Sequence, residues 1–496
     1  MHTIMELRLI LLTFGFIVSD TKADDPGIKG RLTLKGLQYG WQVGLEEMHK
    51  RLETVKIPDV SGSISVAVLG RIYYSVSELK IQDVDLSSSN ISFSPDTGVK
   101  ASINDGQLHV TGYLYIKTVL FSASTQLELR VQGLTVSGVL GITCDDNGHG
   151  AVWNAGCSSG ARDVNLWFHG GAGWLLNMFK NSILGPIHDA LHTQICPEFS
   201  KAVQYMENIL SKLPVSLPVD QVSIFEVSLL GPPLITEKSF DLLVKGEFEG
   251  RYQHWDLPFP PVKLILPDVD SRMLLLALSE VTANSAGFVH YKAGVLGINV
   301  TDDMIPKQSP LRLTVKSLAM FVPELPKRFP DSPPLILQVS ARSAPTVSCQ
   351  PDSLTVQVSA EIQAFTVYPN QTRFPVFLMQ ADSETAVNVI LSEETVGATI
   401  SIKNFSLTLV HSDVGPVKMD SLQKTVNLGL KIMTPFLNER LKKMFPLPTP
   451  LVRLQDPIIR VLQGYLIIMT DLQVTPSSHR TMTSENPPYR EPLVVL

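Results

Sequence analysis

Cysteine is scarce in this sequence, with Cys144, Cys157, Cys196 and Cys349 as the whole set in 496 residues. If all four paired, three connectivities would be possible, so spacing alone does not fix a bridge. Closing the loop between Cys157 and Cys196 would contribute about 4 kcal/mol in the chain-entropy model. A dense disulfide framework is therefore excluded as the main source of stability. A chain of this length is expected to bury large apolar cores in two or three domains.

Excess positive charge is also lacking, because 41 Lys and Arg residues face 47 Asp and Glu residues and the formal net charge is -6. Neither half of the chain is basic. A broad positive surface for nucleic acid is therefore excluded. After the N-terminus, no apolar run reaches the ~20 residues that a membrane-spanning helix needs, so the mature chain is predicted not to be transmembrane.

The N-terminus carries an almost continuous apolar run, Leu7 to Val18, with Arg8 near its start. Small residues in Thr21-Lys22-Ala23 stand at the spacing of a signal-peptidase site. Residues 1–23 are therefore predicted to be a signal peptide, and the mature protein is predicted to be secreted and extracellular.

Four Asn-X-Ser/Thr sequons follow this leader. A single sequon arises by chance, and each alone is compatible with an unmodified surface asparagine. Four of them behind a signal peptide predict N-glycosylation in the secretory pathway. The predicted acceptors are Asn90, Asn299, Asn370 and Asn404.

The first half of the mature chain changes from a helical to a strand-like pattern. From Ile28 to Val55, apolar residues recur every three to five positions, which predicts an amphipathic helix ended by Pro58. From Ser63 to Leu140, short alternating segments separated by turn residues predict an antiparallel, strongly twisted sheet. The helical stripe consists of Ile28, Leu32, Leu37, Trp41, Leu45, Met48 and Leu52.

A second helical region follows a short strand, Val164 to His169, and a glycine turn. The helix is predicted from Trp174 toward Ile195, with an interruption at Pro186 and an end near Pro197, and residues 201–213 continue as a further helix. Its apolar face is broader than a surface helix needs. Such a helix usually packs directly on the sheet. The alternative is a slot between helix and sheet for acyl chains, whose burial contributes ~0.8 kcal/mol per methylene.

The second half repeats this order approximately after a proline-rich linker at Asp256–Pro261. A helix is predicted from Met304 to Phe329, strands from Leu335 to Val410, and a long amphipathic helix from Ser421 to Phe445. A last strand is predicted from Ile458 to Val474. Two similar halves are therefore expected.

Two short motifs raise the question of catalysis or metal binding. Gly156–Gly160 matches the G-x-S-x-G pattern of serine hydrolases, but a polar stretch precedes it and no helix follows directly. His188 and His192 stand one helical turn apart, a spacing that suits zinc, but the Glu base and an obvious third ligand are missing. A chance match and an exposed helix face are the favoured interpretations, so we predict no enzyme, no catalytic residue, no metal site and no cofactor.

Several short segments act as landmarks over nearly the whole mature chain. They are Pro26–Lys29, Lys35–Tyr39, Lys56–Asp59, Gly173–Leu176, Ile195–Cys196, Lys245–Phe248, Ala293–Leu296, Thr301–Lys307 and Phe445–Pro450. In these segments the sequence resembles the bactericidal permeability-increasing and lipopolysaccharide-binding protein family, which includes the plasma lipid-transfer proteins.

The resemblance implies an α+β fold with the shape of an elongated boomerang. Two barrels, each a twisted antiparallel sheet with long amphipathic helices, would be joined by a central sheet. It also implies a disulfide between Cys157 and Cys196 and an apolar pocket for phospholipid in each half, and Cys144 and Cys349 are expected as free thiols. The expected divisions are a signal peptide 1–23, an N-terminal lipid-binding barrel domain 24–215, a central sheet and proline-rich linker 216–270, a C-terminal lipid-binding barrel domain 271–455, a central-sheet strand 456–474 and a flexible tail 475–496.

Members of this family that bind lipid A carry clustered Lys and Arg at the tip of the first barrel. In the matching loops of this chain, Arg71 and Lys117 are the obvious bases that remain for lipopolysaccharide phosphates. Strong endotoxin binding and direct killing are therefore in question, whereas lipid binding is not. The candidate lipid-pocket residues are Leu37, Trp41, Leu45, Met48, Trp174, Leu175 and Met178.

The hypothesis that follows is a secreted lipid-binding glycoprotein of innate immunity. It would bind lipopolysaccharide or a related microbial lipid through apolar pockets, in antimicrobial defence against Gram-negative bacteria, with the bacterial outer-membrane surface as a further partner. The alternative is an extracellular phospholipid carrier or transfer protein without antimicrobial activity. Both would hold a bound phospholipid, and neither needs a cofactor.

Overall fold

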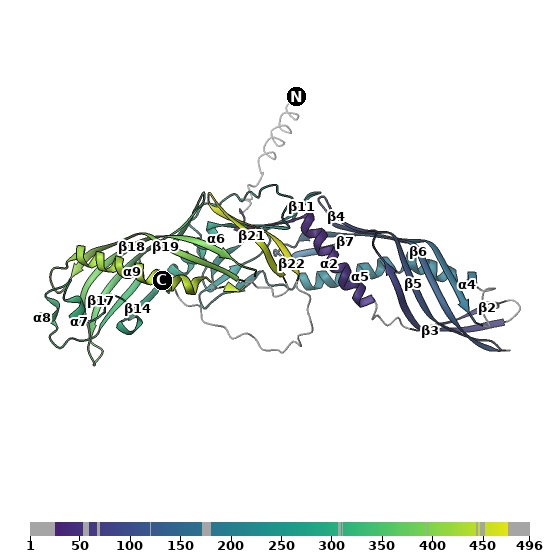
Figure 1. Cartoon of the computed structure of the whole chain (residues 1–496), viewed down its shortest axis with the longest axis horizontal. Helices are drawn as coiled ribbons and strands as arrows, with labels where there is room; N and C mark the ends of the chain where they lie inside the picture. Colours follow the sequence, from purple (N-terminus) through teal and green to yellow (C-terminus); the bar gives the residue numbers. More distant parts are fainter. Residues whose placement is uncertain are drawn as a thin grey trace, which may run out of the picture.

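The computed structural model describes residues 25–52, 59–66, 70–119, 121–170, 180–305, 309, 311–393, 395–442, 445–446 and 452–474. The molecule is elongated and bent, with two lobes extending from a central sheet (Figure 1). All strand pairs are antiparallel, and long helices accompany the sheets. The predicted α+β architecture is confirmed.

Strands from both ends of the sequence build the central sheet, in the order β10, β11, β1, β13, β22, β21. Arg31 on β1 donates hydrogen bonds of 2.7 and 2.8 Å to Asp241 on β11, and Lys29 lies 3.4 Å from the same carboxylate. Because Asp241 is 4 % exposed, these partners keep a buried charge compensated. The strands are β1 (Ile28–Thr33), β10 (Leu234–Ile235), β11 (Ser239–Val244), β13 (Leu274–Ser279), β21 (Val452–Leu462) and β22 (Tyr465–Val474).

The N-terminal lobe is a twisted sheet in the order β2, β3, β5, β6, β7, with β4 paired to β5. Side chains alternate along its long strands, and the inward set includes the buried residues Ile72, Leu114, Leu127 and Leu166. Helix α2 contacts β4, while α4 and α5 contact β7. The elements are α2 (Leu34–Leu52), β2 (Val60–Val66), β3 (Gly70–Asp85), β4 (Ser89–Ser94), β5 (Gly98–Lys117), β6 (Ser122–Cys144), β7 (Gly150–His169), α4 (Lys180–Thr193) and α5 (Ile195–Leu210).

A disulfide joins Cys157 on β7 to Cys196 in the first turn of α5. Further along α5, Glu207 accepts a 2.6 Å hydrogen bond from the backbone N–H of Val152. Cys144 and Cys349 are free thiols. Burial raises the pKa of Cys349 to about 12, so this thiol stays protonated and unreactive at neutral pH.

The C-terminal lobe repeats the plan with a sheet in the order β14, β15, β17, β18, β19, β20, and β16 pairs with β17. Phe321, Leu325, Leu335 and Val376 belong to its buried core. Helix α9 runs along β19 (Figure 1), and α6 contacts the small β12–β9–β8 sheet. The elements are β8 (Ser216–Pro218), β9 (Ser223–Glu226), β12 (Glu247–Gly250), α6 (Glu280–Lys292), β14 (Gly297–Thr301), η2 (Asp302–Met304), α7 (Val315–Leu318), α8 (Leu325–Arg328), β15 (Leu335–Ala341), β16 (Thr346–Gln350), β17 (Ser353–Val367), β18 (Arg373–Leu391), β19 (Thr395–Ser412), α9 (Met419–Leu441) and β20 (Phe445–Pro446).

Two of the predicted helices are wrong in part. Ile28–Thr33 is strand β1, because its backbone pairs with β11 and β13 rather than with its own chain neighbours. Instead of one helix from Met304 to Phe329, the described residues form turns and the short helices α7 and α8. Prolines within that segment lack the N–H that a continuous helix needs.

Pro186 and Pro197 were predicted to interrupt and to end a helix, but both lie inside helices. Helix α4 continues through Pro186, and Pro197 lies in the first turn of α5, where an N–H has no helical partner to lose. The predicted start of that helix at Trp174 lies outside the described residues. The last strand is a hairpin of β21 and β22, which turns at Gly464 with φ 83°. Across the described ranges, no helix is both long and apolar enough to cross a membrane.

We predict that the double substitution Cys157→Ala, Cys196→Ala lowers the free energy of unfolding by up to about 4 kcal/mol, since a loop of 39 residues is no longer closed in the unfolded chain. Urea denaturation of the purified protein measures the loss. Cys144→Ala is the control, because this thiol closes no loop. Equal stability of the two variants would contradict a stabilising role for the bridge.

Candidate functional site

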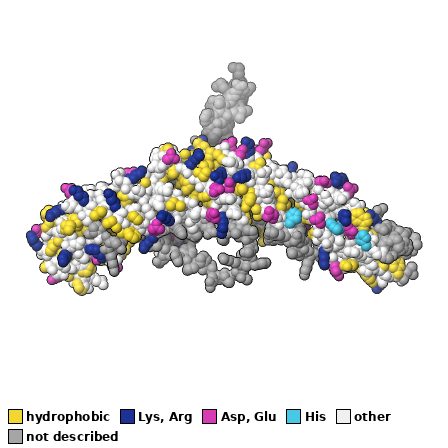
Figure 2. Space-filling model, viewed as in Figure 1, with side chains coloured by type: hydrophobic (Ala, Val, Ile, Leu, Met, Phe, Trp, Pro, Cys, Tyr) yellow, Lys and Arg dark blue, Asp and Glu magenta, His cyan; other side chains and the backbone are white. Residues whose placement is uncertain are grey.

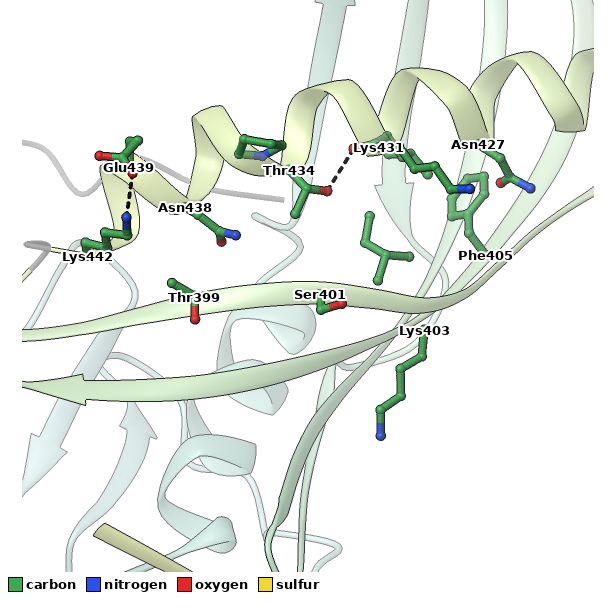
Figure 3. A pocket seen from close by; sticks show the side chains of 13 residues that line it. Thr399, Ser401, Lys403, Phe405, Asn427, Lys431, Thr434, Asn438, Glu439 and Lys442 are labelled. Atoms are coloured by element: carbon green, nitrogen blue, oxygen red, sulfur yellow. Dashed lines mark hydrogen bonds and ion pairs between the residues drawn. The ribbon is translucent and has the colours of Figure 1, made fainter. Parts of the chain in front are cut away.

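A cavity of about 700 Å³ lies between β19 and α9 in the C-terminal lobe (Figure 3). Apolar side chains of both elements, among them Ile402, Phe405 and Leu430, form part of its wall, and polar side chains surround them. Its volume falls within the ~300–1,000 Å³ range of ligand pockets. The lining residues are Thr399, Ser401, Ile402, Lys403 and Phe405 from β19, and Asn427, Leu430, Lys431, Thr434, Pro435, Asn438, Glu439 and Lys442 from α9 and its end.

Two amide side chains hold α9 against β19 along this cavity. Gln423 accepts a 2.7 Å hydrogen bond from the N–H of Leu407 and donates one of 3.1 Å to the carbonyl of Phe405. Asn438 accepts from the N–H of Ile400 at 2.7 Å and donates to its carbonyl at 3.1 Å. We call Gln423 and Asn438 the amide clamps. They are 15 residues apart, which is roughly 22 Å of helix. Asn438 lines the cavity, whose lining continues past it to Lys442.

The clamps are required because β19 is an edge strand. Within the described residues, β20 pairs only with Thr395 and Val396, so the outer edge of β19 has no strand partner from Gly397 onward. At Gly397, a Cβ atom would stand 2.0 Å from the carbonyl oxygen of Lys442, so only glycine allows the end of α9 to approach this closely. The helix thus covers the edge without filling the space beside it.

Positive charge predominates at the rim of the cavity. Lys442 pairs with Glu439 at 2.5 Å. Lys403 and Lys431 have no ion pair with a carboxylate of the described residues, and Lys431 lies beside Phe405 while Lys403 extends away from the helix (Figure 3). The apolar wall could contact the hydrocarbon part of a ligand, and the lysine rim could contact an anionic headgroup.

A second groove, of about 470 Å³, lies between α2 and β4 in the N-terminal lobe. Trp41 and Leu45 line it, and the indole N–H of Trp41 donates a 3.2 Å hydrogen bond to Ser89. Leu37 is half-buried on the same helix but lines none of the cavities described here. The side chain of Met48 and the whole of Trp174, Leu175 and Met178 lie outside the described residues.

A third cavity, of about 350 Å³ and with a mostly apolar lining, lies where α5 reaches the central sheet. This cavity was not predicted from the sequence. Leu210, Leu213, Phe240 and Leu242 are among its lining residues. An exposed apolar stripe on α5 leads to it, with Tyr205 70 % and Ile209 46 % exposed. The spacing of Tyr205, Ile209 and Leu213 is the sequence signal that could have identified this stripe.

Arg71 and Lys117 lie on the outer face of the N-terminal sheet rather than at a cavity. Lys117 is directly opposite Tyr73 across β3 and β5, and Arg71 shares that face two residues before Tyr73. Inward residues of the same strands, such as Ile72 and Ile116, are buried in the core. The structure therefore brings the two bases together beside exposed tyrosines, and separates them from the apolar pockets.

The two catalytic motifs have structural explanations. Gly156–Gly160 lies within strand β7 rather than at a strand-to-helix turn, and Cys157 inside it is disulfide-bonded. His188 and His192 contact each other with ring centroids 4.6 Å apart on α4. In the part of the chain that the structure describes, no group of three His, Cys, Asp or Glu side chains is placed to hold a metal ion.

Comparison with known proteins identifies relatives of both lobes. Residues 36–213 match the N-terminal domain and residues 218–474 the C-terminal domain of the LBP / BPI / CETP family. The chain is 35 % identical to a bactericidal permeability-increasing protein of Sebastes schlegelii, over 92 % of this chain and 98 % of the relative. It is 30 % identical to a lipopolysaccharide-binding protein of Bos taurus, over 94 % and 97 %. A crystal structure of lipopolysaccharide binding protein matches with a TM-score of 0.57 and 27 % identity, covering 91 % of this chain and 99 % of that one.

We predict that Asn438→Leu lowers the free energy of unfolding by about 1–3 kcal/mol, because the N–H and carbonyl of Ile400 lose their partner. Chemical denaturation measures this. Arg440→Leu, at an exposed position on the same helix, is the matched control and should change stability little. Equal effects of the two substitutions would show that the clamp is dispensable.

We further predict that Leu430→Trp, which fills the α9 cavity, at least halves the lipid that this cavity binds, as measured by mass spectrometry of lipids extracted from the folded protein. Leu428→Trp is the control, because Leu428 is 52 % exposed and does not line the cavity. The same lipid content in both variants would exclude the cavity as a binding site.

Proposed function

The chain belongs to the LBP / BPI / CETP family of non-enzymatic lipid-binding proteins, and from this premise we propose that it is a secreted protein of innate immunity that binds lipopolysaccharide or a related microbial lipid. The observation that carries the proposal is the cavity between β19 and α9, with its apolar wall and lysine rim. The name of the Bos taurus relative gives lipopolysaccharide as its ligand, and the name of the Sebastes schlegelii relative gives a bactericidal activity.

Acyl chains would supply most of the affinity. Each methylene that leaves water contributes ~0.8 kcal/mol, so a lipid can be held without a dense set of charge pairs. The α9 cavity and the apolar cavity at the end of α5 offer one such place in each lobe. We assign the C-terminal place to the domain 271–455. In the barrel domain 24–215, the candidate contacts Trp41 and Leu45 line the α2–β4 groove rather than the cavity at the end of α5. The other candidates predicted from the sequence are Leu37, Met48, Trp174, Leu175 and Met178.

Lipopolysaccharide phosphates would be contacted by Arg71 and Lys117 on the outer face of the N-terminal sheet. Both side chains are exposed, and each such ion pair contributes ~0.2–1 kcal/mol. Figure 2 shows that positive and negative side chains are interspersed over the face drawn, which agrees with a formal net charge of -6. Charge therefore adjusts specificity in this proposal, and burial of acyl chains provides the affinity.

A phospholipid carrier without antimicrobial activity is the second candidate. The observation that favours it is the small number of bases beside the outer tyrosines, since Arg71 and Lys117 are the two that the sequence places there. A carrier needs the apolar pockets and no cationic face. In both candidates the leader 1–23 directs secretion, with cleavage after Ala23.

Binding of the purified protein to lipopolysaccharide and to phosphatidylcholine vesicles, at low and high salt, distinguishes the two candidates. We predict that Arg71→Ala, Lys117→Ala together weaken lipopolysaccharide binding by roughly 2-fold to 30-fold at low salt and leave phosphatidylcholine binding unchanged. High salt should remove this difference, because exposed charges are screened. Lys100→Ala, an exposed base elsewhere on β5, is the control.

The carrier would be favoured if the double variant bound both lipids like the unsubstituted protein. Mass spectrometry of lipids that co-purify with the secreted protein tests the pockets themselves. A lipid-free preparation that also takes up no added phospholipid would contradict both candidates.

A further inference from the structure

The hairpin between β17 and β18 carries a sequon in a hydrogen-bonded turn. Gln371 donates a 2.8 Å backbone hydrogen bond to Tyr368, and Tyr368 donates one of 3.0 Å to Thr372. Pro369 occupies the second position of this β-turn, which suits its fixed φ, and Gln371 follows in the left-handed region at φ 64°. The turn is a β-turn followed by a one-residue bulge, a frequent hairpin connection.

This geometry fixes the amide of Asn370. Its Oδ1 accepts a 3.1 Å hydrogen bond from the backbone N–H of Thr372. No acceptor among the described residues takes a hydrogen bond from its Nδ2, and the residue is exposed. The oxygen therefore holds the side chain in place while the nitrogen stays available for modification.

An aromatic pocket of about 360 Å³ adjoins Asn370, and Asn370 itself lines it. The ring of Tyr368 meets that of Phe374 edge-on, with centroids 5.7 Å apart, and Phe374 lies 6.4 Å from the buried Phe329. Phe374 is nevertheless 45 % exposed. Arg328 and Thr372 add polar groups at the same pocket. Phe329 is buried and Tyr368 is partly buried, so Phe374 is the most accessible of the three rings, and exposed apolar area of this kind favours a partner.

A pyranose ring matches this lining. One face of N-acetylglucosamine presents aliphatic C–H groups, which pack on aromatic rings, while its hydroxyl groups lie around the edge where Arg328 and Thr372 stand. The pocket volume is near the lower end of the ~300–1,000 Å³ range for ligand sites, which suits one sugar better than a diacyl lipid. Because Asn370 lines the pocket, a sugar attached to it would lie next to the aromatic rings.

We propose that Asn370 is glycosylated and that the first N-acetylglucosamine packs against Tyr368 and Phe374, so that the glycan becomes part of the C-terminal lobe. The linkage forms when Nδ2 attacks C1 of a polyprenyl-diphosphate-linked oligosaccharide in the secretory pathway. The Nδ2–C1 bond forms, the C1–O bond to the diphosphate breaks with its electron pair leaving on the diphosphate, and Nδ2 loses one proton. The inference requires secretion but does not depend on which lipid is bound.

The other sequons in the C-terminal lobe offer a contrast. Asn404 donates its Nδ2 hydrogen to Glu384 at 3.0 Å, and Asn299 is an exposed residue of β14 that lines none of the described cavities. A glycan on Asn299 would extend into solvent. Asn299→Gln is therefore a matched control for Asn370→Gln.

The test uses the full chain secreted from eukaryotic cells. Peptide mass spectrometry should find a glycan on Asn370. Asn370→Gln should lower Tm by about 2–4 °C and increase amide exchange in residues 368–374, whereas Asn299→Gln should change neither. Trimming all glycans to a single N-acetylglucosamine should leave Tm and exchange as they were, because the first sugar makes the contacts.

A double-mutant comparison separates sugar packing from damage to the hairpin. Tyr368→Val should lower Tm more in the glycosylated protein than in the Asn370→Gln background, since only the former loses a contact with the sugar. Equal losses in the two backgrounds, an Asn370→Gln variant as stable as Asn299→Gln, or an unmodified Asn370 in the secreted protein would each overturn the proposal. None of these readouts changes if the lipid-binding function is wrong.

Discussion

Hydrogen bonds from amide side chains to strand edges hold helices α9 and α6 in place. An edge strand presents N–H and carbonyl groups that need partners, and Asn or Gln supplies one acceptor and one donor, as another peptide would. Gln423 and Asn438 do this for β19, and Asn284 on α6 does it for Val347 on β16, at 2.6 and 2.9 Å. An amide clamp keeps the helix a side chain's length from the strand, so the α9 cavity follows from the way the edge is satisfied.

In the N-terminal lobe, other groups attach the helices to the sheet. Glu207 binds the backbone of Val152, Trp41 binds Ser89, and the disulfide anchors the start of α5. The contact of each helix with its sheet is thus fixed at a few polar or covalent points. Apolar residues of α5 such as Tyr205 and Ile209 remain exposed in the described chain, and under the proposed function they would be available to acyl chains.

The spacing of apolar residues along the sequence correctly predicted several helices and strands of this fold. The apolar spacing of residues 421–445 placed α9 within a few residues of Met419–Leu441, and the alternation between Leu335 and Val410 predicted the strands beneath it. Ile28–Thr33 was misread because Ile28 and Leu32 fit a helical stripe as well as a strand, and only the pairing with β11 and β13 decides between them. The amide clamps could not be foreseen, since Gln423 and Asn438 look like ordinary polar helix residues until β19 is placed beside them. The family resemblance implied a pocket in this half of the chain, but not its place between β19 and α9.

The composition of the central sheet determines the order in which the chain can fold. Arg31 on β1 and Asp241 on β11 are 210 residues apart in sequence, and Arg272 and Asp471, which join the sheet's other half, are 199 apart. At ~5–20 residues per second, a ribosome needs roughly 10–40 s to supply β11 after β1. Strands β2 to β7 pair only with one another in the described chain, so the N-terminal sheet can form during synthesis, before the partners of β1 have been made. Ile28–Thr33 therefore has no sheet partner until β11 and β13 have been synthesised, and β21 and β22 join last, because residues 452–474 are made after every other strand of this sheet.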